Sequence, residues 1–119
     1  MATGLAWSLF ALGVAHIAYG VWRFRSPLSD AVAAGFVGQF AAPEDRRTAF
    51  WFLSLGPLLM LTGQVACDAA ATGNLGLLRL IGYYLLGASG VGVLAFPRSP
   101  LWLPLALSPF FLAAGYDAL

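Results

Sequence analysis

Charged residues are scarce in this chain. Its 119 residues include six Lys or Arg and five Asp or Glu, and every basic residue is an arginine. The charged share is 9%, against about 25% in ordinary soluble domains. So few charges cannot cover a water-exposed surface, which excludes a soluble globular domain. A hydrophobic share of 61% also excludes a disordered chain.

Metal-binding and redox residues are nearly absent. The chain has one cysteine, Cys67, and one histidine, His16, so it can form no internal disulfide and no Cys/His metal cluster. We therefore predict no metal and no cofactor. The net charge is +1 with no basic tract, which argues against a nucleic-acid partner. The apolar N-terminus follows no basic segment, so we expect a retained membrane helix rather than a signal peptide.

What the chain has instead is long apolar segments, with a mean hydropathy of +0.83. A helix that crosses a membrane needs about 20 mostly apolar residues. Four segments approach this length, at about residues 5–22, 47–66, 76–96 and 101–116. The last is short and contains Pro104 and Pro109. We predict an all-α integral membrane four-helix bundle that forms a single membrane domain over residues 1–119.

The connection between the first two predicted spans has a pattern of its own. Ser26-Pro27 is typical of a helix start, and Leu28, Val32, Phe36 and Phe40 then recur every four residues. This spacing predicts an amphipathic helix over about residues 27–40, lying flat in the membrane interface or under the end of the helix bundle.

The arginines predict an orientation in the membrane. Arg23, Arg25, Arg46 and Arg47 flank the first connection, and Arg98 lies in the connection between spans three and four. Cytoplasmic connections carry an excess of arginine and lysine. We therefore expect a multi-pass protein of the cell membrane, with residues 23–47 and 97–100 cytoplasmic and both termini outside.

His16 is the first candidate for chemistry, because a polar side chain about 9 Å inside a span usually faces the bundle interior. It could be a structural imidazole bonded to a neighbouring group, or a pocket histidine that binds a ligand or moves a proton. Counting residues from the same membrane face places Ser54, Ser89 and Ser108 at its depth, which suggests one polar layer. Each serine could also simply bond its own helix.

A second candidate cluster belongs to the cytoplasmic mouth. Tyr19 shares a helix face with His16, and the following residues could gather near it: Gln39, Glu44, Asp45, Arg46, Arg47 and Trp51. Glu44 or Asp45 could form an acid–base pair with His16. The plainer interpretation is an ion pair of Glu44 with Arg46 or Arg47, and likewise of Asp68 with Arg79 on the far side.

Several motifs together point to a family. They are residues 12–20 (LGVAHIAYG), residues 45–52 (DRRTAFWF) with Gly56 and Gly63, and residues 90–99 (GVGVLAFPRS) followed by Trp102. The chain resembles an uncharacterised bacterial family of small four-helix integral membrane proteins, a domain of unknown function. The resemblance implies the fold and topology but no reaction, and it marks His16, Arg47, Phe50 and Trp51 as positions of interest.

Two functions are consistent with these observations. The first is a polar pocket around His16 that binds a lipophilic small molecule, and that could act as an acid–base isomerase or cyclase of a terpenoid-like substrate. Its catalytic residues would be His16, Glu44 and Asp45, and its ligand-binding residues would be Tyr19, Gln39, Arg47, Phe50, Trp51, Ser54 and Ser89. The second is a non-catalytic structural or accessory membrane subunit. The expected partners are membrane lipids, and a homo-oligomer or a partner membrane protein stays open.

Overall fold

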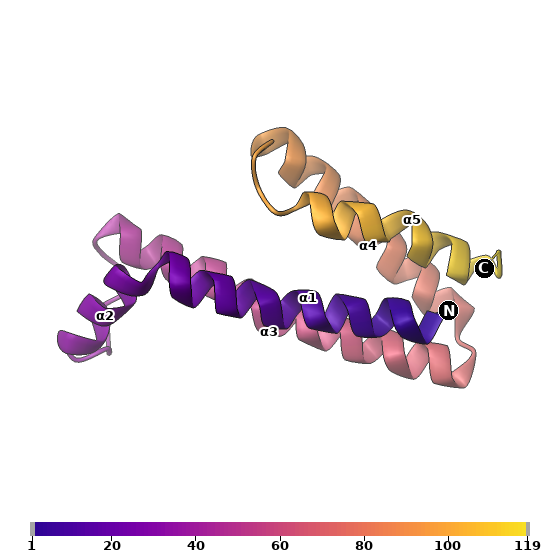
Figure 1. Cartoon of the computed structure of the whole chain (residues 1–119), viewed down its shortest axis with the longest axis horizontal. Coiled ribbons are helices and arrows are strands. Elements are labelled where there is room, and N and C mark those ends of the chain that lie inside the picture. The colour runs from indigo at the N-terminus through magenta and orange to yellow at the C-terminus, as the bar shows by residue number, and fades with distance from the viewer. Residues whose placement is uncertain (1, 119) are drawn as a thin grey trace. The chain divides into compact units, whose positions relative to one another are not determined.

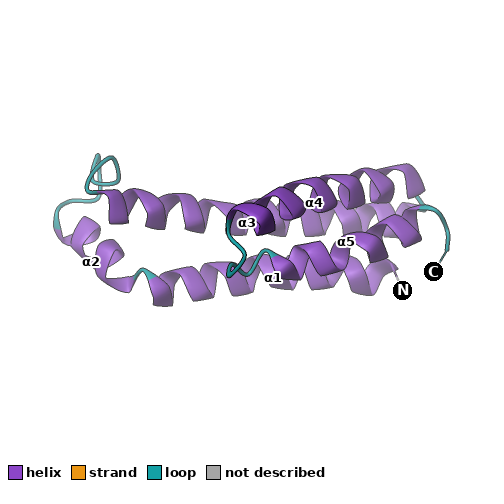
Figure 2. Ribbon diagram, turned by 90° about the horizontal axis from the view of Figure 1, so that it is seen from above, coloured by secondary structure: helices purple, strands orange, loops and turns teal. Residues whose placement is uncertain are grey.

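The computed structural model describes residues 2–118, which form helices and no strand. Figure 1 labels the five helices of this region: α1 (Ala2–Arg23), α2 (Arg25–Ala33), α3 (Glu44–Thr72), α4 (Leu75–Ala95) and α5 (Trp102–Gly115). Figure 2 shows the loops and turns that connect them. The all-α prediction is confirmed, but the described chain has five helices rather than four.

Three helices are long and apolar enough to cross a membrane, namely α1, α3 and α4. The fourth predicted span corresponds to α5, which has only 14 residues. At 1.5 Å per residue α5 is about 21 Å long, whereas the hydrocarbon core of a bilayer is about 30 Å thick. Within the described residues, three helices of full length are therefore consistent with the membrane protein that the composition predicts.

The helix between the first two candidate spans is shorter than predicted. The apolar spacing predicts a helix over residues 27–40, but α2 ends at Ala33. Gly35, Phe36 and Gly38 have φ angles of +107°, +68° and +73°, which interrupt a right-handed helix. Residues 34–43 are therefore a turn and loop region, and α3 begins at Glu44, three residues before the predicted span.

The chain divides into two compact units. Among the described residues, unit 1 contains 2–10 and 62–118, and unit 2 contains 11–61. Both α1 and α3 therefore contribute one part to each unit.

In unit 2, glycines let α1 and α3 pack closely. A Cβ added to Gly13 would lie 2.7 Å from the Met60 backbone nitrogen and 2.8 Å from the Gly56 carbonyl oxygen. One added to Gly20 would lie 2.6 Å from the Leu53 side chain. The residue numbers rise along α1 while those of its contacts fall along α3, so the two helices are antiparallel. Small residues are the usual means of close helix approach in membranes.

In unit 1, α4 and α5 form an antiparallel hairpin. Gly92 of α4 lies against Leu101, Gly82 lies against Leu112, and Arg79 lies against Gly115. The buried apolar residues of this unit come from all four of its helical segments: Ala6, Leu9, Ala66, Ala69, Leu78, Ile81, Leu85, Val93, Phe111 and Ala114. The end of α5 thus lies level with Arg79, close to the start of α4.

The predicted ion pairs are absent. No carboxylate lies within 4.0 Å of a basic nitrogen anywhere in residues 2–118. Arg79 does not pair with Asp68; its Nη1 donates to the Gly115 carbonyl at 2.7 Å. Arg46 does not pair with Glu44; its Nη1 donates to Gln39 Oε1 at 3.0 Å. The guanidinium groups of Arg46 and Arg79 thus donate to uncharged oxygens rather than to carboxylates.

Candidate ligand pocket and the His16 cluster

His16 is tied to the neighbouring helix by its ring. Its Nε2 lies 2.6 Å from the carbonyl oxygen of Phe52, and a carbonyl can only accept, so Nε2 donates the hydrogen bond. The two rings are also stacked, with their centroids 4.0 Å apart and their planes 16° apart. In the described structure His16 therefore links α1 to α3 inside unit 2.

Phe52 is the centre of an aromatic cluster. Its ring lies 5.3 Å from that of Phe24 and 5.9 Å from that of Tyr19, in addition to the His16 contact. A Cβ on Gly20 would come within 2.8 Å of Phe52 Cδ1, so the glycine makes room for this ring. Phe52 belongs to the motif of residues 45–52, but that motif does not predict its central position among these rings.

A proline in α3 lies close to this contact in the sequence. Pro57 has no backbone N–H, so it cannot donate to the carbonyl of Leu53, four residues earlier. Neighbouring helices commonly provide donors near such positions in membrane proteins. The carbonyl that His16 binds belongs to Phe52, directly before Leu53, so it is not the carbonyl that Pro57 leaves without a helix donor.

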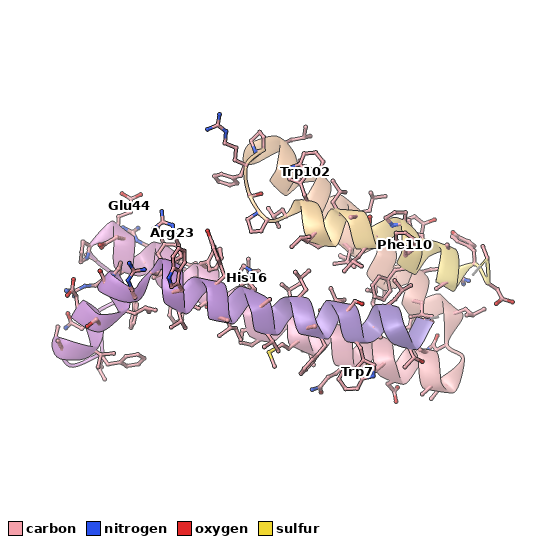
Figure 3. The ribbon with its side chains drawn as sticks, viewed as in Figure 1. Trp7, His16, Arg23, Glu44, Trp102 and Phe110 are labelled. Atoms are coloured by element: carbon pink, nitrogen blue, oxygen red, sulfur yellow. The ribbon has the colours of Figure 1, made fainter. Side chains whose placement is uncertain are left out.

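A large open pocket lies at the α2 end of unit 2. Its volume is about 880 Å³, and it is lined by residues 22–27 and by Glu44, Asp45 and Thr48. Figure 3 shows Arg23 and Glu44 at this end of the unit. The lining comes from the end of α1, Phe24, the start of α2 and the first two turns of α3. A volume of this size is in the range of small-molecule sites, roughly 300–1,000 Å³.

The pocket contains charges of both signs. Arg23 and Arg25 belong to the lining segment of residues 22–27, and Glu44 and Asp45 belong to the lining residues of α3. Arg25 Nη1 donates to the Trp22 carbonyl at 2.8 Å, and Asp45 Oδ1 accepts from the Arg46 amide at 2.8 Å. The Glu44 side chain has no hydrogen bond among residues 2–118.

The predicted acid–base pair is not brought together. Glu44 precedes Phe52 by eight residues on α3, which is about 12 Å along the helix axis. Within the described chain, no hydrogen bond joins His16 to Glu44 or Asp45. The two carboxylates line the pocket, whereas His16 lies about two helical turns away from them, in the packing of α1 on α3.

The predicted ligand-binding residues of unit 2 do not line the pocket. Tyr19 is exposed beside the Phe52 ring, and Gln39 accepts a bond from Arg46. Phe50 lies between Phe40 and Trp51, at ring distances of 5.6 and 5.5 Å, and Arg47 is exposed. Ser54 donates to the Phe50 carbonyl of its own helix. Phe24 and Arg25 do line the pocket, although no pattern in the sequence predicts them there.

Two of the serines in the predicted polar layer belong to unit 1. Ser89 and Ser108 are both buried, and Ser108 donates to the Leu105 carbonyl of its own helix at 2.7 Å. A second, smaller pocket of unit 1, about 490 Å³, is formed by residues 95–99. The layer with His16 and Ser54 stays a prediction.

Comparison with known proteins gives a family but no activity. A family of unknown function, DUF6463, matches residues 2–117. The chain belongs to this family. No curated protein and no solved structure matches. The family resemblance expected from the motifs is therefore confirmed as membership of an uncharacterised family, whose description gives neither a source nor a reaction.

Proposed function

We propose that this member of DUF6463 is a non-catalytic multi-pass membrane protein that binds an amphiphilic lipid in the pocket lined by residues 22–27, Glu44, Asp45 and Thr48. The observation that carries the proposal is the pocket itself. It has aromatic and charged walls, and it lies where two long apolar helices end. Ligand sites combine such apolar walls with a few polar groups.

The pocket would lie at the headgroup level of the membrane. Tryptophan and arginine are typical of this level, and Trp22, Arg23 and Arg25 line the pocket. The excess of arginine supports a cytoplasmic position for this end of the unit. Lipid headgroups and acyl chains are both present at this level, so an amphiphilic lipid is the ligand class that we expect the pocket to bind.

We further propose that α5 crosses the membrane despite its length. It pairs antiparallel with α4 from Leu101 to Gly115, and Arg79 near the start of α4 donates to the Gly115 carbonyl. If α4 crosses, the end of α5 therefore lies close to the opposite face. This supports two cytoplasmic connections and both termini outside.

A structural role for His16 agrees better with the geometry than a catalytic one. Its ring already donates to the Phe52 carbonyl and is stacked on the Phe52 side chain. An isomerase or cyclase would need a substrate to displace these contacts. The hydrogen bond between His16 and Phe52 also favours the alternative of an accessory subunit, because there the polar side chains of the spans only hold helices together.

Native mass spectrometry of the gently solubilised protein tests the proposal. Wild type should retain lipid, and Arg23→Gln/Arg25→Gln should lose it. Arg47→Gln/Arg98→Gln is the matched control, because it also removes two arginines from the predicted cytoplasmic side but none from the pocket. His16→Phe should keep its lipid. Equal retention by the two double variants contradicts the proposal, and a stoichiometric partner chain without lipid would favour the accessory subunit.

A further inference from the structure

The charges of the pocket are balanced. Its lining has two cations, Arg23 and Arg25, and two anions, Glu44 and Asp45. A purely anionic ligand bound there would face two carboxylates, and a purely cationic ligand would face two guanidinium groups. Like charges at close range raise the free energy of a complex. The lining therefore favours a ligand that carries both signs.

These opposite charges do not neutralise each other. No ion pair is formed within residues 2–118. The guanidinium of Arg25 lies 5.5 Å from the centre of the Trp22 ring, and that of Arg23 lies 5.4 Å from the centre of the Phe24 ring. Arginine at such distances is attracted to the aromatic face. Both arginines thus lie beside aromatic rings, Arg25 also donates to the Trp22 carbonyl, and Asp45 accepts only from the Arg46 amide. Neither charge type is used up in an ion pair, so both can still bind a ligand.

Each charge type matches a particular chemical group. Guanidinium groups bind phosphate oxygens through paired N–H donors. Carboxylates accept hydrogen bonds from a primary ammonium, which has three N–H donors, whereas a trimethylammonium has none. The combination matches a phosphate diester joined to a primary ammonium by a short linker.

On the basis of the proposed lipid-binding function, we propose that the pocket recognises the headgroup of an aminophospholipid with one phosphate and one primary ammonium, as in phosphatidylethanolamine. Arg23 and Arg25 bind the phosphate, and Glu44 and Asp45 bind the ammonium. The arginines come from the α1–α2 junction and the carboxylates from the first turn of α3. Recognition therefore needs both segments of unit 2 at once.

The test is a competition between three lipids. Wild-type protein in detergent is incubated with equal amounts of phosphatidylethanolamine, phosphatidylcholine and phosphatidylglycerol with identical acyl chains, and the bound lipids are counted by native mass spectrometry. We expect phosphatidylethanolamine to exceed each of the others about tenfold, which corresponds to about 1.4 kcal/mol. Glu44→Gln/Asp45→Asn should bind phosphatidylglycerol at least as well as phosphatidylethanolamine. Asp30→Asn/Asp68→Asn, outside the lining, should keep the wild-type preference.

The outcomes separate this inference from the proposed function. Equal binding of the three lipids by wild type, or an unchanged preference in Glu44→Gln/Asp45→Asn, overturns the headgroup assignment. The lipid-binding function survives that result if Arg23→Gln/Arg25→Gln still loses all three lipids. Unchanged lipid binding in Arg23→Gln/Arg25→Gln overturns both. Competition by inorganic phosphate as strong as by phosphatidylethanolamine also overturns the assignment, because it would leave the ammonium without a role.

Discussion

The Nε2 of His16 donates a hydrogen bond to the backbone carbonyl of Phe52, 36 residues later in the chain, while the two rings stack at 4.0 Å. One side chain thus makes a polar and an apolar contact with the same residue of the opposite helix. Such a pair fixes both the register and the rotation of α1 against α3 at this level. It explains why a costly polar group can lie inside an apolar span.

Replacement of His16 by phenylalanine tests this role. His16→Phe keeps a flat ring for stacking but removes the donor, so the loss should be that of one hydrogen bond between helices. Such bonds contribute about 0.6 kcal/mol on average and up to about 1.7 in membrane proteins. We expect the free energy of unfolding in bicelles to fall by this amount, with bound lipid unchanged.

Tyr19→Phe is the control for that measurement. The Tyr19 hydroxyl has no hydrogen bond among the described residues and lies on the same helix face as His16. Its removal should leave the unfolding free energy within about 0.5 kcal/mol of wild type. A His16→Phe protein of full stability that has lost its lipid would show that His16 belongs to the binding site instead.

The glycine contacts between α1 and α3 give the second prediction. An added Cβ on Gly13 meets backbone atoms of Met60 and Gly56, which cannot move aside as a flexible side chain can. Gly13→Ala should therefore push the helices apart and lower the unfolding free energy by about 1–3 kcal/mol. Chemical unfolding in mild detergent, followed by far-UV circular dichroism, measures this loss.

Gly87→Ala is the control for Gly13→Ala, because it makes the same substitution at a position where an added Cβ has free space. Nothing lies within 4 Å of a Cβ at Gly87, which is also inside a long apolar helix. Alanine favours the helix by up to about 1 kcal/mol over glycine. Stability should therefore stay equal or rise, and equal losses in both variants would refute the close packing of α1 on α3.

Much of the fold could be predicted from the sequence, because apolar runs of helix length are a strong signal. The predicted start of the first connection is within two residues of the end of α1 at Arg23. The end of α2 could not be predicted by spacing. Phe36 continues the four-residue pattern of Leu28 and Val32, but its φ of +68° takes it out of the helix. The flanking Gly35 and Gly38 were the better signal, since glycine favours such turns.

The candidate site was harder to predict, for a physical reason. Depth counting gives the level of His16 along the membrane normal, and Phe52 lies only two residues from the Ser54 expected there. It cannot give the rotation of each helix, and the partner of His16 is a backbone carbonyl, a group that every residue has. The pocket depends on how the α1–α2 junction folds back toward Glu44, and the periodicity of apolar residues does not predict this fold-back.

The orientation of the helices gives the third prediction. In a Cys67→Ser background, single cysteines at exposed positions 29, 72 and 118 report on which side of the membrane three places lie. These places are α2, the end of α3 and the segment after α5. We expect a membrane-impermeant thiol reagent to label Thr72→Cys and Ala118→Cys from outside, and Ser29→Cys only after the cytoplasmic face is opened. Labelling of positions 29 and 118 from the same side would mean that α5 does not cross.

The last prediction concerns Arg79, whose Nη1 donates to the Gly115 carbonyl and whose guanidinium lies 5.2 Å from the centre of the Tyr116 ring. The last carbonyls of a helix have no partner within the helix, so this arginine satisfies one of those at the end of α5. Hydrogen bonds that involve a charged group contribute about 1.5–3 kcal/mol. Arg79→Gln should therefore lower the unfolding free energy by roughly that amount, measured in the same detergent as above.

Arg79→Lys and Asp68→Asn identify the cause of that loss. Lysine keeps the charge but lacks the planar group that covers Tyr116, so Arg79→Lys should recover only part of the stability. Asp68→Asn should cost nothing measurable, because Asp68 and Arg79 form no ion pair in the structure. If Asp68→Asn instead cost as much as Arg79→Gln, the ion pair predicted from the sequence would hold in the membrane. Arg79 would then anchor the turn between α3 and α4 rather than the end of α5.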